Sequence, residues 1–434
     1  MRVPKGDARA SPLLFLRSCA SADPSTPLGI NLKHLMPTLL TSLRALPRPV
    51  WILFGGTFIN RFGTFVMPFL AIYLTREGYS TTQAGIALST YGAGHMVAAV
   101  IGGHLADRIG RRNTIALSMF ASAIVMVALT QVHTLATTLV VVFIAGMVGE
   151  IYRPAATALI GDLVAPEQRM IAFGMYRFAI NLGFACGPAV AGFLADRSFN
   201  YIFLGDGATS LVYGIVALVA LPHGLRSSGK DEKPAAGLRV ALSDRMFMLF
   251  LLATLFLVCV EFQTLSTFPV HITKLGYSPA VYGGLLAING VMIVTLELLL
   301  TAWAQRFPPQ PLIALGYGLT GIGFGLTGLA TGIPMLAVTV MIWTIGEMVY
   351  APVSTTYVTA LAPERYRGRY MGLWHSTWSA GMLLGPALGT MLYERSPAML
   401  WIACLALGLA AASLALVRPK AAIMAECSGN PSSS

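Results

Sequence analysis

The feature that most constrains this chain is a series of long apolar runs that contain no charged residue. Ser396–Val417 has no Asp, Glu, Lys or Arg, and neither does Phe307–Gly346, which is interrupted by the turn sequence TGIP at Thr331–Pro334. A helix needs about 20 apolar residues to cross the hydrocarbon core of a bilayer, so the first run predicts one membrane span and the second predicts two. Charged residues make up only 11% of the chain. The sequence therefore predicts an all-α membrane protein.

Apolar windows bounded by charges and turn residues predict twelve transmembrane helices. They cover residues 50–74, 83–105, 114–132, 135–158, 171–195, 201–221, 246–270, 280–303, 311–331, 334–356, 371–392 and 397–417. The most polar internal stretch, His223–Arg239, separates the sixth window from the seventh. We therefore expect a disordered cytoplasmic tail (1–49), an N-terminal six-helix bundle (50–222), a cytoplasmic linker (223–245), a C-terminal six-helix bundle (246–418) and a second cytoplasmic tail (419–434).

Lys and Arg are distributed unevenly between the two sides of these windows. The side that holds both termini has 22 of the 29 Lys and Arg, the opposite side has four, and three (Arg61, Arg153 and Arg177) fall inside spans. Because basic loops stay in the cytoplasm, we expect both termini there and the chain in the inner, plasma membrane. The net charge of +11 then faces anionic lipid rather than nucleic acid.

Nothing in the sequence is typical of an enzyme or of a cofactor site. The five cysteines are scattered, with no CxxC pair and no ligand-like spacing to His, so we expect neither a metal site nor a disulfide framework. GxSxG, HExxH and Walker motifs are absent from the sequence. We expect no catalytic activity and no cofactor.

The two halves of the chain repeat each other at an offset of 198 residues. TREGYSTTQAG at Thr75–Gly85 aligns with TKLGYSPAVYG at Thr273–Gly283, and further glycines and prolines align at the same offset. Matches among turn glycines and prolines indicate duplication, because two unrelated apolar segments would match mainly at Leu and Ala. Duplicated six-helix halves are one way in which transporters form a site at the midplane.

A charged loop, GHLADRIGRR, joins the second and third predicted helices at Gly103–Arg112. We expect Gly103 to let two helices approach closely and Gly110 to adopt a positive φ in a tight turn. Asp107 is placed to bond neighbouring helix N-termini or an arginine when the cytoplasmic side is closed. Three arginines are expected to hold the loop at the inner interface: Arg108, Arg111 and Arg112. A loop that is only a basic anchor is the alternative.

This loop resembles the signature of the major facilitator superfamily, G-x-L-A-D-R-x-G-R-R. The resemblance implies twelve helices in two pseudo-symmetric six-helix bundles and a secondary active transporter whose halves rock around a central site. In the second half the matching loop reads AWAQRFPPQP, with Gln305 in place of Asp107 and Pro308 in place of Gly110. We therefore expect any gate latch to be asymmetric between the two halves.

The fifth predicted helix contains GMYRFAINLGFACGPAVAG, which resembles the antiporter motif of the drug:proton antiporters in that superfamily. Its motif residues are Gly174, Gly183, Gly187, Pro188 and Gly192, and a copy in the eleventh helix has Gly372, Gly381, Gly385, Pro386 and Gly389. Glycines four apart favour close helix packing, and the proline removes one backbone hydrogen bond. The resemblance implies export driven by proton entry, although a duplicated motif also suits a symmetric hinge.

Several ionisable residues lie inside predicted spans, where they are costly and are functional candidates by default. The candidates for proton coupling are Glu150, Glu261 and Glu347, because burial favours the neutral form of a carboxyl group. The alternative is that each acid is paired with a neighbour; Glu150 and Arg153, at i and i+3, are the clearest case.

The charge partners expected in the cavity are Arg61, Arg153, Arg177 and His375, and the repeat aligns the last two. Either could bind an anionic group or pair with a glutamate. The motif arginine of the fourth helix is replaced by Val142, so Arg153 or Arg177 would have to take its place. Two other ionisable residues, His95 and Asp206, are expected to be satisfied locally.

The predicted cavity has few polar side chains, mainly Asn60, Gln263 and Asn289, which favours a lipophilic or amphipathic substrate over a sugar. We therefore predict a proton-coupled exporter of a small molecule that functions as a monomer in the lipid bilayer. The alternatives are a proton-coupled importer of a sugar or organic acid, and a membrane receptor that moves nothing.

Overall fold

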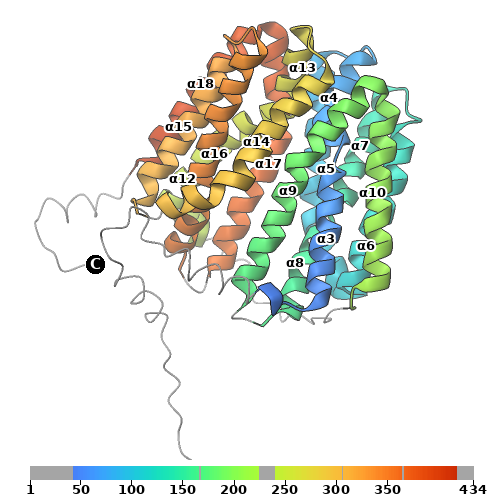
Figure 1. The fold of residues 1–434 in the computed structure, drawn as a ribbon. Coiled ribbons are helices and arrows are strands. Elements are labelled where there is room, and N and C mark those ends of the chain that lie inside the picture. Colours follow the sequence, from blue (N-terminus) through green and yellow to red (C-terminus); the bar gives the residue numbers. More distant parts are fainter. Residues whose placement is uncertain (1–42, 166–167, 224–239, 305, 364–365, 418–434) are drawn as a thin grey trace, which may run out of the picture. The chain divides into compact units, whose positions relative to one another are not determined.

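The apolar windows of the sequence form long helices that run side by side (Figure 1). The computed structural model describes residues 43–165, 168–223, 240–304, 306–363 and 366–417. Most of each predicted tail and of the predicted linker lies outside the described residues, so the proposed division into tails, linker and two bundles stays a prediction. All helices below belong to the unit Pro47–Ser434.

The described residues of the first half form eight helices. They are α3 (Arg48–Phe62), α4 (Val66–Arg76), α5 (Thr81–Ile109), α6 (Arg111–Leu129), α7 (Leu135–Glu150), α8 (Tyr152–Leu163), α9 (Arg169–Arg197) and α10 (Phe199–Ala220). The pairs α3 with α4 and α7 with α8 each form one span that is broken near its middle, and each of the other four helices matches one predicted window.

The second half follows the same order. Its helices are α12 (Arg245–Glu261), the 3-10 turn η2 (Phe262–Thr264), α13 (Thr267–Lys274), α14 (Pro279–Ala304), α15 (Pro309–Thr327), α16 (Ile333–Leu361), α17 (Arg367–Arg395) and α18 (Pro397–Ala415). The break between α12 and α13 falls at the same place in the repeat as the break between α3 and α4, as a duplicated chain requires.

Nine helical segments among the described residues are long and apolar enough to cross a membrane, and the bent helix α5 makes a tenth. The other two predicted windows correspond to α15, which contains five glycines, and α17, which has charged residues at both ends. Both pack against helices that meet the criterion: α15 against α16 and α18, and α17 against α5 and α12. The prediction of an all-α, multi-span membrane protein is confirmed.

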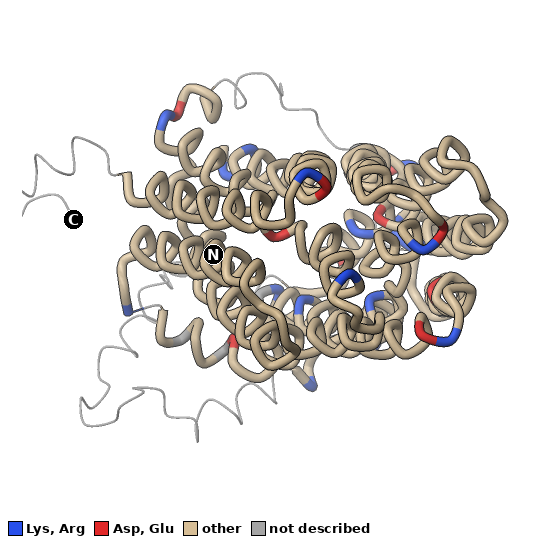
Figure 2. The backbone as a smooth tube through the Cα atoms, turned by 90° about the horizontal axis from the view of Figure 1, so that it is seen from above, with Lys and Arg blue, Asp and Glu red and all other residues tan. Residues whose placement is uncertain are grey.

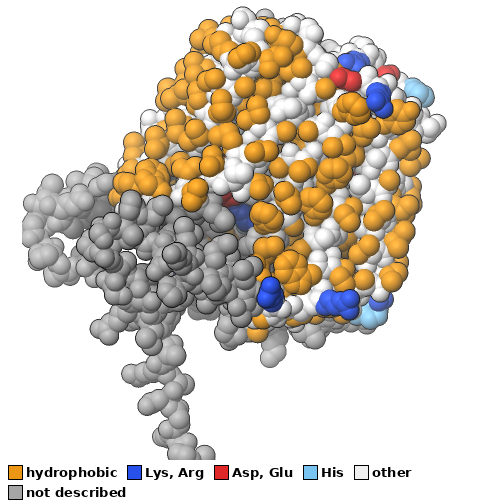
Figure 3. Space-filling model, viewed as in Figure 1, with side chains coloured by type: hydrophobic (Ala, Val, Ile, Leu, Met, Phe, Trp, Pro, Cys, Tyr) orange, Lys and Arg blue, Asp and Glu red, His pale blue; other side chains and the backbone are white. Residues whose placement is uncertain are grey.

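The outer surface has the character that lipid requires. Large apolar side chains such as Ile124, Val219 and Ile402 are well exposed on the flanks of the helices. Apolar side chains cover much of the face in Figure 3, where most of the visible Lys and Arg lie near its two ends. Viewed from above, the tube in Figure 2 is mostly free of charged residues. Fully hydrogen-bonded helices with apolar flanks are the usual solution for a chain in hydrocarbon.

Among the described residues the two halves contact each other mainly along three helix pairs, α5 with α17, α9 with α14, and α4 with α13, and α13 also touches α5. At the end where α4 and α13 lie (top of Figure 1), the rings of Phe69 and Tyr282 meet edge to face at 5.1 Å. At the same end the backbone N–H of Thr82 donates to Glu394 Oε2 at 3.1 Å. The apolar cluster of this end draws on both halves, whereas the cluster around Phe247 and Trp374 draws on the second half alone. The halves are therefore joined at this end.

Candidate transport site

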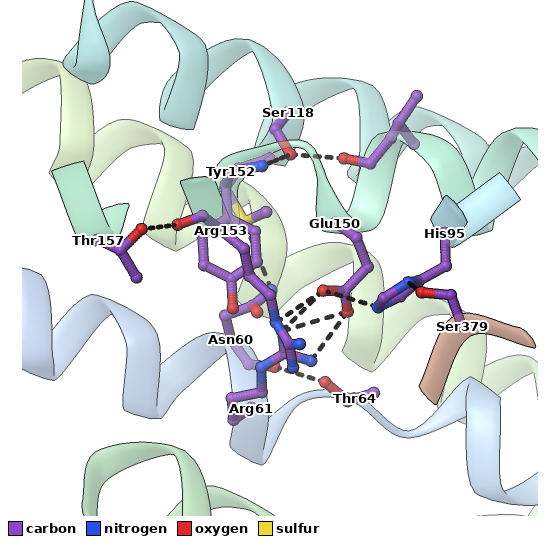
Figure 4. Close-up of polar contacts among 12 residues, drawn as sticks. Asn60, Arg61, Thr64, His95, Ser118, Glu150, Tyr152, Arg153, Thr157 and Ser379 are labelled. Atoms are coloured by element: carbon purple, nitrogen blue, oxygen red, sulfur yellow. Dashed lines mark hydrogen bonds and ion pairs between the residues drawn. The ribbon is translucent and has the colours of Figure 1, made fainter. Parts of the chain in front are cut away.

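Glu150 is the centre of a buried charge cluster in the first half (Figure 4). It ends α7, and its side chain is 8% exposed. The guanidinium of Arg61 donates from Nη1 and Nη2 to Oε1, both at 3.2 Å, and from Nη2 to Oε2 at 3.3 Å. Arg153 Nε lies 2.8 Å and His95 Nε2 lies 3.6 Å from Oε2. Glu150 thus has the partner Arg153 that the paired-acid alternative named, and a second arginine besides.

Two breaks in the helices bring this cluster together. Glu150 and Arg153 lie on either side of Ile151, where α7 passes into α8. The hydroxyl of Ser118 on α6 bridges this break, because it donates to the carbonyl of Val148 and accepts from the backbone N–H of Tyr152. Serine thereby replaces helical hydrogen bonds that the break has removed.

The first span is broken just after Arg61, and Asp206 on α10 stabilises the break. Its Oδ2 accepts hydrogen bonds from the backbone N–H groups of Phe65 and Val66, both at 3.2 Å. A carboxylate at a helix N-terminus satisfies free N–H groups and complements the helix dipole, so Asp206 acts as a cap for α4 supplied by a distant helix. Asp206 was expected to be satisfied locally, but its partners Phe65 and Val66 lie on a distant segment of the chain and engage only Oδ2.

The two remaining glutamates lie in the second half and have different partners. Glu261 ends α12 and accepts a short hydrogen bond on Oε1 from the hydroxyl of Tyr350. Glu347, on α16, accepts on Oε2 from Asn289 Nδ2 at 3.1 Å. Among the described residues neither glutamate forms a salt bridge. These two acids are therefore held by neutral donors, unlike Glu150.

The break in the seventh span is stabilised without charge. Gln263 in η2 donates from Nε2 to the carbonyls of Cys259 and Gly385, at 2.8 and 2.9 Å. Its Oε1 accepts from the hydroxyls of Ser266 and Thr267, at 3.1 and 2.9 Å. Gln263, expected from the sequence to contact substrate, is fully used by the backbone and hydroxyls around this break. That expectation is corrected: the side chain is structural here.

Among the described residues, one ion pair connects the halves. Arg177 Nη2 on α9 lies 2.9 Å from Glu297 Oε1 on α14, and Asn181 Nδ2 donates to Glu297 Oε2 at 3.3 Å. Arg177 therefore pairs with Glu297 and not with one of the three candidate glutamates. His375 is exposed on α17, with its ring 5.0 Å from that of Trp374.

The loop between α5 and α6 agrees with the prediction for Gly110 and differs from the predictions for Gly103 and Arg111. Gly110 has φ of 90°, as expected of a tight turn. Gly103 was expected at a close helix contact, but a Cβ there would meet nothing within 4 Å, whereas a Cβ at Gly102 would lie 2.6 Å from the carbonyl oxygen of Ile151. The prediction for Gly103 was wrong by one residue, which is a rotation of about 100° around a helix.

The arginines of this loop are not equivalent. Arg111 was expected at the membrane interface, yet its side chain is 7% exposed and its Nε lies 3.1 Å from Asp162 Oδ2 on α8. It is therefore part of a buried ion pair, which corrects the anchor role. Arg108 and Asp107 are exposed, and Arg112 Nε donates to Asn113 Oδ1 at 3.4 Å. Within the described residues Asp107 forms no hydrogen bond or ion pair, so its latch role stays a prediction.

Comparison with known proteins decides the family. The profile of the Major Facilitator Superfamily matches residues 53–295 and 267–426, which is most of the chain. The chain belongs to the Major Facilitator Superfamily. It is therefore a secondary transporter, and the family is not one of enzymes.

Named members of the superfamily resemble this chain at low identity. The quinolone resistance protein NorA of Staphylococcus aureus is 24% identical over 80% of this chain and 90% of its own length. A Na(+), Li(+), K(+)/H(+) antiporter of Planococcus maritimus is 25% identical over 77% of this chain and 87% of its own length. A crystal structure of a POT family transporter has a TM-score of 0.72 and 16% identity, covering 89% of this chain and 99% of that one. At this identity the structure supports the fold alone.

The motif glycines of α9 and α17 make equivalent close contacts in the two halves. A Cβ at Gly183 would lie 2.6 Å from the Cβ of Arg61, and one at Gly187 would lie 2.5 Å from the carbonyl oxygen of Phe62. Gly381 and Gly385 of α17 face Val258 and Cys259 of α12 in the same manner. The first glycine of each motif, Gly174 and Gly372, meets nothing within 4 Å, whereas Gly192 packs on α14 and Gly389 on Gln263. The carbonyl oxygens of Pro188 and Pro386 lie against Gly283 and Gly85.

The sequence did not reveal several side chains that bind the acids or stabilise the helix breaks. Of the donors to the second-half acids, Asn289 was predicted only as a polar residue of the cavity, and Tyr350 was not singled out. Ser118 and the capping role of Asp206 left no local signal, because a bond to a distant helix break does not alter periodicity. The only available signal was the presence of an Asp in an otherwise apolar helix.

Proposed function

We propose that this transporter exports a small lipophilic or amphipathic compound in exchange for protons, by alternating access. It would act in the inner membrane as a monomer, with both termini in the cytoplasm. The proposed coupling residues are Glu261 and Glu347, and Glu150 has a structural role in the charge cluster. The proposal extends the family assignment, which establishes a secondary transporter but neither substrate nor direction.

The observation that carries this proposal is the contrast between the acids of the two halves. Glu150 is neutralised by two arginines, so its negative charge is compensated in every protonation state of the rest of the site. Within the part of the chain that the structure describes, Glu261 accepts a hydrogen bond from a tyrosine hydroxyl and Glu347 from an amide, and neither has a cation as partner. Two carboxylates without a counter-ion are costly at membrane depth, and protonation removes that cost. The second-half acids are therefore the ones able to alternate between charged and neutral states.

Alternating access couples this protonation to transport. When the site faces water, a carboxylate is hydrated and can exist charged; when the halves enclose it, the neutral form is favoured. Exposure to the acidic side then loads the protons, and exposure to the cytoplasm releases them. A substrate that binds better to the deprotonated site would move in the opposite direction to the protons.

Direction and substrate class rest on the comparisons and on the distribution of charge. One relative is named as a quinolone resistance protein and another as a cation/proton antiporter. The excess of Lys and Arg on one side supports a cytoplasmic location of both termini. Partly buried aromatics on α3 and α17, such as Phe58, Phe62 and Trp378, suit an apolar ligand.

The test uses purified protein reconstituted into liposomes, with ethidium and norfloxacin as probes and an imposed pH gradient. We expect gradient-driven transport to fall by about tenfold or more in both E261Q and E347Q, equal to ~1.4 kcal/mol or more of coupling free energy. Binding of the probes should persist, because glutamine retains the size of the side chain. The matched control is E77Q, at an exposed acid in the turn after α4.

Three results would overturn parts of the proposal. Unchanged coupling in both variants would remove the second-half acids from the mechanism. Probe movement in the same direction as the protons would make the protein an importer of the symport type. Tight binding with no flux of any probe, in protein that is folded and correctly inserted, would favour a receptor.

A further inference from the structure

A small polar cavity lies inside the first half, between the charge cluster and the helix break. Its volume is about 30 Å³, and its lining comes from α3, α4, α5, α6, α7 and α10. The polar side chains that line it are Asn60, Arg61, Thr64, Tyr91, Ser122, Glu150 and Asp206. All of them belong to the first half, so this cavity is separate from the second-half acids of the proposed coupling site.

Several polar groups of the cavity lack a partner within the part of the chain that the structure describes. Asp206 is 7% exposed, and only its Oδ2 is used by the cap, while Oδ1 accepts nothing. Arg61 is 4% exposed, and its Nε is buried without a hydrogen bond. Because buried polar groups are normally satisfied by protein or by ordered water, these atoms indicate a small polar occupant.

The occupant that fits is water. A cavity needs about 10–15 Å³ to hold one water molecule, so this one has room for roughly two. A metal cation would meet the carboxylates but also the guanidinium of Arg61, which lines the same small space and would repel it. Water can donate to Asp206 Oδ1 and accept from Arg61 Nε, which satisfies both groups.

The helix break before α4 does not need a charged side chain such as Asp206 to stabilise it. In the second half the equivalent break is stabilised by Gln263 and hydroxyls, with no charge, and the repeat places Cys404 where the first half has Asp206. A neutral acceptor is therefore sufficient to cap such a break. Arg61 and Arg153 together have one more positive charge than Glu150 can balance, and an ionised Asp206 supplies the missing negative charge.

We propose that Asp206 is a second protonation site of the transporter, linked to the Arg61–Glu150 pair through water in this cavity. The titratable or charged groups that face it are Arg61 on α3, Tyr91 on α5 and Glu150 on α7. When Asp206 gains a proton, the first-half cluster gains a net positive charge and the cap of α4 weakens. The proposal stands on the first half alone and does not depend on Glu261 or Glu347.

Infrared spectroscopy of the reconstituted protein tests the protonation site directly, without a substrate. The carbonyl stretch of each protonated carboxyl group is followed as the pH is varied. D206N keeps the size and one oxygen acceptor of the side chain, and we expect it to lose one titrating band that the wild type shows. D196N, at an exposed acid near the end of α9, should leave that band in place.

A second variant keeps the test valid if D206N does not fold. S122A changes the cavity wall on α6 and does not touch the cap, so it should shift the frequency of the same band. The proposal is overturned if folded D206N retains every titrating band, or if S122A shifts no titrating carboxyl band of the wild type. Transport assays of E261Q and E347Q report separately on the proposed function.

Radiolytic labelling with mass spectrometry tests for the water. Hydroxyl radicals formed from bound water oxidise adjacent side chains, so Met126 in the cavity wall should be oxidised although it is buried. Met348, which is also buried but lies in the second half and outside this cavity, is the control and should stay unmodified. Equal protection of both methionines would exclude water there. In the infrared experiment, a shift of the carboxyl band assigned to Asp206 when sodium replaces potassium would show a cation site instead.

Discussion

At the scale of single residues, the acids of this protein differ in function because they differ in partners. Glu150 has two arginines and a histidine, whereas Glu261 and Glu347 have one neutral donor each. All three are glutamates in apolar helices, and the sequence offers a nearby cation, Arg153 at i+3, to Glu150 alone. What separates them is whether a cation on another helix reaches the carboxylate, and this determines which acid can exchange a proton.

The Arg61–Glu150 pair should behave as a unit in stability measurements. R61A leaves Glu150 buried with less compensation, and we expect a loss of about 3–5 kcal/mol of unfolding free energy. The double variant R61M/E150M removes both charges and should cost less than the sum of the single variants R61M and E150M. Thermal unfolding in detergent, read as a double-mutant cycle, measures the coupling. Additive losses would contradict a direct interaction.

Two glycines of one loop provide a matched pair. Gly110 has φ of 90°, so G110A should lose about 1–2 kcal/mol, whereas G103A occupies open space on a helix and should be neutral or slightly stabilising. Thermal stability of both variants, measured at equal expression, checks the difference. Equal losses at both positions would show that the turn does not impose the left-handed conformation.

At the scale of elements, the sequence predicts where the helices lie but not where they break. Apolar windows and charged loops place the spans to within a few residues because the bilayer imposes length and hydropathy. The breaks at Gly63 and Gln263 involve no change in hydropathy, and their stabilising groups come from Asp206 and from hydroxyls in the turn itself. Arg61 and Glu150 are 89 residues apart, so their contact depended on packing that periodicity does not encode.

The packing of α9 on α3 can be tested with two glycines of the same motif. G187A would place a methyl group 2.5 Å from the carbonyl oxygen of Phe62, so we expect overpacking to cost about 1–3 kcal/mol and to displace Arg61. G174A, where nothing lies within 4 Å, is the control and should retain stability and transport. Thermal unfolding and transport of ethidium are the measurements. A tolerated G187A would mean that the two helices can separate without loss.

At the scale of the whole molecule, the contacts between the halves define which movements transport requires. The end that carries α4 and α13 is joined by Thr82 with Glu394 and by Phe69 with Tyr282. The pair Arg177–Glu297 and the glycines Gly192 and Gly283 lie along the contact between α9 and α14. Alternating access requires the contacts at the joined end to separate once per cycle, while a contact near the pivot can persist.

A reversible cross-link at the joined end therefore stops transport. In a background without the five native cysteines, T82C/E394C places two thiols where the backbone N–H of Thr82 now lies 3.1 Å from the carboxylate of Glu394. Oxidation should abolish ethidium flux because this end cannot open, and reduction should restore it. Binding of ethidium should survive oxidation, since the site remains accessible from the other end. Each single cysteine variant controls for the substitution itself, and mass spectrometry confirms the disulfide. Full flux through protein that is quantitatively cross-linked would mean that these contacts do not separate, and that substrate moves without the rocking of the halves.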